Sequence, residues 1–150
     1  MNTEIHTEQA SLSDLDEIMH IEHTSFGVDA FSRQQMAYLV SHAKGVFLIA
    51  RYNKKIAGYI SFTTSNRHNT GRIYSIAVNP EYRACGIGGI LLNKTIEYAH
   101  QKGLRSIFLE VRIDNSAAIS VYEKNGFTKR SIKTNYYHDG AAAYSMVLHL

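Results

Sequence analysis

Apolar residues recur along the chain with two different periods, and the changes of period divide it into helices and strands. Over residues 12–26 they are spaced three or four positions apart, as on one side of an amphipathic helix. Ser32 and Gln35 then have the spacing of a capping box, which predicts a second helix through about residue 40. Residues 4–10 are compatible with a strand ahead of both helices.

After Gly45 the spacing becomes that of β-strands. Residues 46–52 and 55–65 are separated only by Asn53 and Lys54, so this stretch predicts a β-hairpin. The remaining predicted segments are a strand at residues 71–78, a helix from Gly88 to Gly103, a strand at 106–112, a helix at 116–125 capped by Asn115, and strands at about 129–137 and 142–149. The apolar run at residues 106–112 indicates a strand buried on both faces.

The order of these segments predicts the α/β (α+β) class, with a mixed sheet and helices on its faces. The chain has 150 residues, of which 45% are apolar, and this is enough material for one hydrophobic core. No composition shift, repeat or low-complexity stretch marks a linker. We therefore expect residues 1–150 to form a single domain.

Composition argues against several classes of protein. No run approaches the roughly 18 apolar residues of a membrane span, and the first nine residues lack the basic start and apolar middle of a signal peptide. Together with the single cysteine, Cys85, these features favour a cytoplasmic protein without a disulfide framework. The net charge is +3 without a basic run, so we expect neither a nucleic acid nor a membrane as partner.

Gly86, Gly88 and Gly89 stand at the start of the predicted helix, where glycine lowers helix stability. A Walker-type phosphate loop is excluded because Gly88 is followed by Gly89 and Ile90 rather than by a lysine and a hydroxyl residue. A dinucleotide fingerprint fits poorly because position 91 is a leucine and the preceding strand ends well before Gly86.

Two interpretations of the glycines remain open on these grounds. Free backbone amides and the positive end of a helix can bind an anion, helped by Arg83. Alternatively, the glycines let the helix pack closely on the sheet.

Two blocks of sequence resemble a known family. Residues 73–92, IYSIAVNPEYRACGIGGILL, resemble motif A of the GCN5-related N-acetyltransferases (GNAT), in which Gln or Arg, two residues, Gly, one residue and Gly or Ala follow one another. Arg83, Gly86 and Gly88 occupy those three places. Residues 109–127, LEVRIDNSAAISVYEKNGF, resemble the motif B region of RimI-type ribosomal-protein-alanine N-acetyltransferases.

This resemblance implies a sheet of about seven mostly antiparallel strands that is split between strands 4 and 5, with the pantetheine of acetyl-CoA in the opening. It implies that the backbone of Ile76, Ala77 and Val78 pairs with the pantetheine amides. The residues implied for the pyrophosphate are Arg83, Ala84, Cys85, Gly86, Ile87, Gly88 and Gly89.

The loop departs from the family pattern at two places. Positions 84 and 89 are often basic in relatives and are Ala84 and Gly89 here, so we expect looser cofactor binding than in a relative that has both basic residues. Cys85 is interpreted as a tolerated side chain at a variable position, although a thiol near a helix amino terminus can also be acidified and react.

Glu110 and Tyr122 are the candidate catalytic residues. Glu110 is the one carboxylate within an apolar run, where burial would raise its pKa and suit it to act as a general base through water. Asn115, Ala118 and Tyr122 share one helical face, so contact of this face with pantetheine would place Tyr122 near the sulfur as general acid. Without the resemblance, an exposed structural glutamate and a core tyrosine would explain both residues equally well or better.

Other polar residues carry weaker predictions. Tyr136 and Tyr137 either line the acceptor pocket, as paired tyrosines do in the family, or pack within a strand. His20 and His23 lie one turn apart beside Glu17, but no third ligand is defined, so we interpret them as part of a solvated face. The implied chemistry requires no metal.

The resemblance implies acetyl transfer from acetyl-CoA to a primary amine, with CoA as product, and the close relatives favour the α-amino group of a protein amino terminus. The alternatives are a small amine or a lysine side chain as acceptor, or a CoA-binding sensor without turnover. Ala142 and Ala143 replace an Asp-Ala pair that is common in the family, so contacts to the acceptor are expected to differ. The family contains both monomers and homodimers.

Overall fold

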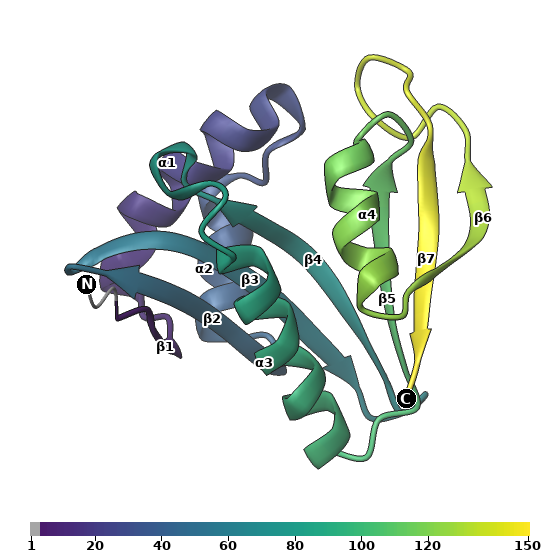
Figure 1. The fold of residues 1–150 in the computed structure, drawn as a ribbon, viewed down its shortest axis with the longest axis horizontal. Helices are drawn as coiled ribbons and strands as arrows, with labels where there is room; N and C mark the ends of the chain where they lie inside the picture. Colours follow the sequence, from purple (N-terminus) through teal and green to yellow (C-terminus); the bar gives the residue numbers. More distant parts are fainter. Residues whose placement is uncertain (1–3) are drawn as a thin grey trace.

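The computed structural model describes residues 4–150 as a seven-stranded sheet flanked by helices (Figure 1). The first three residues of the segment compared above with a signal peptide lie outside this range. The strands are β1 (His6–Gln9), β2 (Gly45–Tyr52), β3 (Lys55–Ser65), β4 (Thr70–Val78), β5 (Ser106–Arg112), β6 (Thr128–Lys133) and β7 (Ala143–His149). The α-helices are α1 (Leu15–Phe26), α2 (Arg33–Ser41), α3 (Ile87–Gln101) and α4 (Ser116–Lys124), and short 3-10 turns cover Leu12–Asp14, Gly27–Asp29 and Pro80–Tyr82.

The sheet has the strand order β1-β2-β3-β4-β5-β7-β6 and is antiparallel except between β4 and β5. That parallel pair is short, because only residues 70–72 of β4 pair with residues 106–108 of β5. Beyond this point the two strands move apart, as Figure 1 shows between the β4 and β5 labels. The predicted fold class and the predicted split between the fourth and fifth strands are therefore confirmed.

Apolar clusters hold helices on both faces of the sheet. On one face, Leu91 and Leu92 of α3 pack with Ile60 and Phe62 of β3, and this cluster continues to Ile119 of α4. On the other face, a second cluster joins α1 and α2 to β2 and β3; its fully buried members include Ile18, Met36, Phe47, Ile49 and Tyr59. None of the helices in residues 4–150 is long and apolar enough to cross a membrane.

Local side-chain signals set several element boundaries as predicted. Asn53 and Lys54 both have positive φ, as a tight hairpin turn between β2 and β3 requires. The Ser32 side chain accepts a hydrogen bond from the Gln35 amide, and the Gln35 side chain accepts one from the Ser32 amide, so the capping box before α2 is confirmed. Asn115 likewise caps α4 through the Ala118 amide.

Two predictions about strands were wrong. Strand β5 is fully buried on only one face, because Phe108, Glu110 and Arg112 alternate with the buried residues and are only partly buried. Strand β6 ends at Lys133 instead of near residue 137. All its residues are exposed, so no buried face extends it, and Asn135 adopts a φ of 52° that breaks the strand.

Candidate active site

The edge of β4 that faces β5 is open over Ile76, Ala77 and Val78. On the other edge these residues pair with β3, whereas pairing with β5 ends at Arg72. Backbone N–H and C=O groups along such an edge can pair with the amides of an extended ligand, as an added strand does. The structure thus places the three residues implied for pantetheine on the edge of the opening.

Residues 83–86 lead from the 3-10 turn after this end of β4 into α3, and residues 87–89 form the first turn of that helix; we call residues 83–89 together the loop. Ala84 and Gly86 have φ values of 67° and 77°, and the first helical hydrogen bond runs from the Ile90 amide to the Gly86 carbonyl. No hydrogen bond within the described residues uses the amides of residues 84–89. These free amides and the positive end of α3 are suited to an anion.

Contacts around the glycines separate the two interpretations left open above. A Cβ at Gly86 or Gly89 would meet nothing within 4 Å, and one at Gly88 would meet only Val78 Cγ2 at 3.8 Å. By contrast, a Cβ at Gly58 of β3 would lie 2.8 Å from the Ala77 carbonyl oxygen and 2.9 Å from Ile87 Cγ2. Gly58 therefore provides the close approach of helix and sheet, and packing does not require the bare loop.

The loop residues fit the diphosphate of a nucleotide cofactor through their backbone more than through their side chains. Arg83, Ala84 and Cys85 are exposed, and Arg83 is the one cation among residues 83–89. Ile87 points inward and is buried at the start of α3. The Cys85 thiol is free and exposed.

Glu110 lies on β5 just beyond the last residue that pairs with β4. Its carboxylate is 9% exposed, is paired with Arg72 of β4, and accepts a hydrogen bond of 3.0 Å from Lys133 Nζ at the end of β6. Burial acts to raise the pKa of Glu110, but the hydrogen bonds and charges of Arg72 and Lys133 outweigh it and hold the pKa below its ordinary value.

The prediction of a raised pKa for Glu110 was therefore wrong in direction. The sequence showed the apolar neighbours of Glu110 along β5 but not the two cations that reach it from β4 and β6.

Tyr122 is buried on α4, with 7% of its surface exposed, and its ring centroid lies 5.9 Å from that of Phe127. Burial raises the pKa of Tyr122, and the nearby Tyr137 raises it further. No hydrogen bond within residues 4–150 holds its hydroxyl. Tyr122 is thus protonated at neutral pH, which the role of a proton donor requires.

The remaining predicted residues of α4 lie at its start. Asn115 is exposed, and its side-chain oxygen accepts the Ala118 amide at 3.2 Å, which leaves the Asn115 side-chain NH₂ group available to a ligand. Ala118 is half-buried one turn before Tyr122.

Tyr136 and Tyr137 lie in the segment between β6 and β7, not in a strand. Their rings meet edge to face at a centroid distance of 4.9 Å, and Lys133 Nζ lies 5.7 Å from the Tyr136 ring. Burial, and after it the neighbouring Tyr136, raises the pKa of Tyr137 to about 12. The charge of Glu110 acts in the same direction. The structure therefore brings both tyrosines together with Glu110 and Tyr122.

Sequence reasoning missed a group of charges that joins the turn after α1 to the segment before β7. Asp29, after α1, accepts hydrogen bonds from the His138 backbone amide at 3.1 Å and pairs with His138 Nδ1 at 2.6 Å. Arg112 of β5 reaches Asp29 at 3.7 Å and also pairs with Asp139. No sequence pattern relates position 29 to position 138, so only the fold reveals this connection, which we call the Asp29 clamp.

Glu22 of α1 forms a second missed network beneath the same region. Its carboxylate is 1% exposed, accepts hydrogen bonds from the Ser75 hydroxyl at 2.7 Å and from the Phe31 amide at 2.9 Å, and is bonded to the Tyr59 hydroxyl. The network fixes the segment after α1 against the sheet. His20 and His23 are exposed on this helix, and no cluster of three potential metal ligands occurs among the described residues.

Comparisons with known proteins agree with this geometry. Residues 12–127 match the acetyltransferase (GNAT) family. The chain is 31% identical to an N-alpha-acetyltransferase of Sulfurisphaera tokodaii, in an alignment that covers 91% of this chain and 88% of that relative. It is 42% identical over 65 residues to the [ribosomal protein bS18]-alanine N-acetyltransferase of Escherichia coli, an alignment that covers 43% of this chain and 44% of that enzyme.

The fold is also similar to a solved structure. The crystal structure of the ribosomal-protein-S18-alanine N-acetyltransferase from Escherichia coli superposes with a TM-score of 0.87 and 28% identity, over 97% of this chain and 94% of that one.

Proposed function

The chain belongs to the acetyltransferase (GNAT) family and is an N-acetyltransferase, and we propose that it acetylates the α-amino group of a protein amino terminus. One observation supports the proposal most directly: β4 and β5 part after Arg72, and Glu110 lies on β5 just beyond this point. Relatives that are named for acetylation of amino termini or of a ribosomal-protein alanine support this acceptor. Residues 1–150 act as one catalytic domain in this proposal.

Acetyl-CoA, the cofactor of the family, supplies the acetyl group as a thioester. In this chain the free edge at Ile76, Ala77 and Val78 would bind its pantetheine amides. The free amides of residues 84–89, with the side chain of Arg83, would hold its pyrophosphate. Asn115 and Ala118 would contact the pantetheine from the start of α4.

The acceptor amine must be neutral to attack. An α-amino group with a pKa of about 8 is roughly one-tenth neutral at pH 7, whereas a lysine with a pKa of about 10.4 is neutral at only a few parts in ten thousand. Because its pKa is lowered, Glu110 stays ionised at neutral pH and is a weak base. A weak base is sufficient to take the proton of an α-amino group, but it is less suited to take the proton of a lysine. The chemistry of Glu110 therefore favours the amino terminus as acceptor.

Glu110 accepts the proton of the attacking amine through a water molecule as the carbon–nitrogen bond forms. Tyr122 would give its hydroxyl proton to the thioester sulfur as the carbon–sulfur bond breaks, so that the leaving group would be the neutral thiol. The proton gained at Glu110 and the one lost at Tyr122 balance, and exchange with water restores both residues. Tyr136 and Tyr137 line the place of the acceptor beside Glu110.

A competition assay tests the acceptor. The protein receives acetyl-CoA with a lysine-free peptide that begins with alanine, an amino-blocked peptide that contains lysine, and spermidine, and mass spectrometry identifies the products. We expect acetylation mainly of the alanine peptide, and its loss in Glu110→Gln. Preference for lysine or spermidine would contradict the proposed acceptor, and binding of acetyl-CoA without any product would support a sensor instead.

A further inference from the structure

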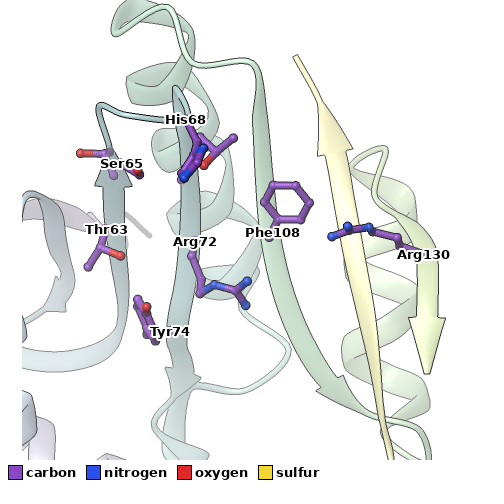
Figure 2. Close-up of a pocket in the computed structure, with 10 residues that line it drawn as sticks. Thr63, Ser65, His68, Arg72, Tyr74, Phe108 and Arg130 are labelled. Atoms are coloured by element: carbon purple, nitrogen blue, oxygen red, sulfur yellow. The ribbon is translucent and has the colours of Figure 1, made fainter. Parts of the chain in front are cut away.

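A hollow of about 470 Å³ lies on the same face of the sheet as Glu110, at the end where β4 and β5 are still paired. Its wall includes Thr63 and Ser65 of β3, Arg72 of β4, Phe108 of β5, Arg130 of β6, and His68 from the β3–β4 turn. Figure 2 shows Arg72 extending toward β5 and Arg130 reaching across β7 toward Phe108. Four strands thus present side chains to one space.

The charges that line the hollow are both positive. They belong to Arg72 and Arg130; His68 adds an imidazole, and no aspartate or glutamate lines the hollow. The charge of Arg72 is balanced by Glu110, whereas Arg130 forms no ion pair with any described residue. The hydroxyls of Thr63 and Ser65 add neutral donors. This lining is complementary to an anion.

Arg130 lies over the ring of Phe108 in the lining of the hollow. Its guanidinium carbon lies 5.1 Å from the centroid of the Phe108 ring. A guanidinium that stacks on a ring loses side-chain freedom but keeps its in-plane N–H groups for a bidentate hydrogen bond to a carboxylate.

The hollow lies next to the candidate catalytic carboxylate, which is not itself part of its lining. Arg72 lines it and also binds Glu110, and Phe108 precedes Glu110 by two positions on the same face of β5, about 6.6 Å along the strand. An extended peptide advances about 3.3–3.6 Å per residue. With the acceptor amine at Glu110, the side chain of its second or third residue would therefore reach the hollow.

The cofactor is not a candidate occupant. The loop of residues 83–89 follows the carboxyl end of β4, whereas the hollow contacts Thr70 and Arg72 at the other end of that strand. The phosphates and the hollow thus lie at opposite ends of β4.

We propose that this hollow is a specificity subsite that binds the carboxylate of an aspartate or glutamate at the second or third residue of the acceptor. The proposal rests on the proposed function, because it assumes that the acceptor is a peptide whose amine reacts at Glu110. It assigns Arg130 as a specificity-determining residue outside the reacting centre.

Matched peptides test the subsite. Each begins with alanine and carries Glu, Gln or Lys at position 2 or position 3 in an otherwise neutral, lysine-free sequence, and kcat/KM is measured at low salt. We expect the best Glu peptide to exceed its Gln counterpart about tenfold, mainly through KM, as for one charge-assisted hydrogen-bonding pair. Arg130→Gln is expected to remove the preference, and Arg130→Glu to reverse it in favour of Lys.

Lys129→Gln is the matched control, because Lys129 is the adjacent cation on β6 but lies 4.4 Å from the Tyr144 ring and does not line the hollow. The control is expected to keep the preference for Glu. Equal rates for the Glu and Gln peptides, or a preference that survives in Arg130→Glu, would overturn the subsite and leave the proposed function intact. Acetylation of spermidine with none of the peptides modified would overturn both.

Discussion

On the side of the opening formed by β4 and the start of α3, the groups available to a ligand are backbone amides. On the side formed by β5 and the segment before β7, they are charged and phenolic side chains: Glu110, Lys133, Tyr136 and Tyr137. The first side presents few side chains, since a Cβ at Gly86 or Gly89 would stand in open space. Backbone can hold one common ligand in many sequences, whereas side chains can distinguish one acceptor from another.

This difference predicts which positions can be changed at little cost. Ala84 and Gly89 depart from the basic residues that are frequent in the family, yet the geometry of free amides at the start of α3 is complete without them. On the β5 side, by contrast, replacement of one charged residue leaves its partner without an ion pair. Glu110 pairs with both Arg72 and Lys133, and Asp29 pairs with both His138 and Arg112.

Tyr122→Phe is expected to have the largest effect, because Tyr122 is the proposed proton donor to the leaving sulfur. The substitution removes a hydroxyl that has no hydrogen-bond partner in the described chain, so packing and CoA affinity should change little. Loss of a general acid should lower kcat by about 100-fold or more. Steady-state kinetics and CoA titration measure the two effects.

Tyr98→Phe on α3 is the control for this experiment, since Tyr98 packs against Phe62 on the helix-covered face away from the opening. It should leave kcat unchanged. If Tyr122→Phe weakens CoA binding as much as it lowers kcat, Tyr122 is a binding residue and not a proton donor.

Two glycine substitutions are expected to separate packing from ligand access. Gly58→Ala should lower the free energy of unfolding by about 1–3 kcal/mol, because its Cβ would overlap the Ala77 carbonyl and Ile87. Gly89→Ala should instead raise it by up to about 1 kcal/mol, because alanine favours the helix and meets no atom. Urea denaturation measures both, and a comparable loss in the two variants would show that packing requires the bare loop after all.

Gly89→Arg is expected to strengthen CoA binding by a smaller factor, about threefold, as one exposed charge contact would. The new side chain begins in open space at the start of α3, because a Cβ at position 89 meets no atom of the described residues within 4 Å. Gly89→Gln adds similar bulk without the charge and should leave the dissociation constant unchanged. An unaltered constant in Gly89→Arg would contradict the expectation of loose binding.

The smallest effect concerns acid stability. The pKa of Glu110 is lowered in the folded protein, so its ion pairs stabilise the fold above the ordinary value of 4.5 and are lost as pH falls through the folded pKa. Glu110→Gln should therefore be less stable near pH 6 and lose less stability on acidification toward pH 3. Thermal unfolding across this range checks it, with the exposed Glu97→Gln as control. If Glu110→Gln and the wild type show equal slopes, the ion pairs contribute nothing.

Much of the fold could be predicted because its signals are local. The period of apolar residues and the caps at Ser32 and Asn115 each involve neighbouring positions, and they set the helices and most strands correctly. The end of β6 was missed because the residues from Thr128 onward are exposed and carry no periodic signal.

The candidate site could be predicted less completely, for a related reason. Glu110 and Tyr122 were proposed from short motifs; the structure places Glu110 just beyond the last β4–β5 pair and buries Tyr122 on α4. The partners that set the charge state of Glu110 lie 38 and 23 positions away in sequence, on different strands. Such pairings depend on the strand order and register, which a single sequence does not display.

The Asp29 clamp has a consequence for redesign. It makes the turn after α1 and the segment before β7 one structural unit, although 109 positions separate Asp29 from His138. A transplant of either segment alone from a relative would break this unit and leave charges without partners. An exchange of both segments together keeps their contacts intact, so selectivity in this scaffold would have to be grafted as a pair of loops.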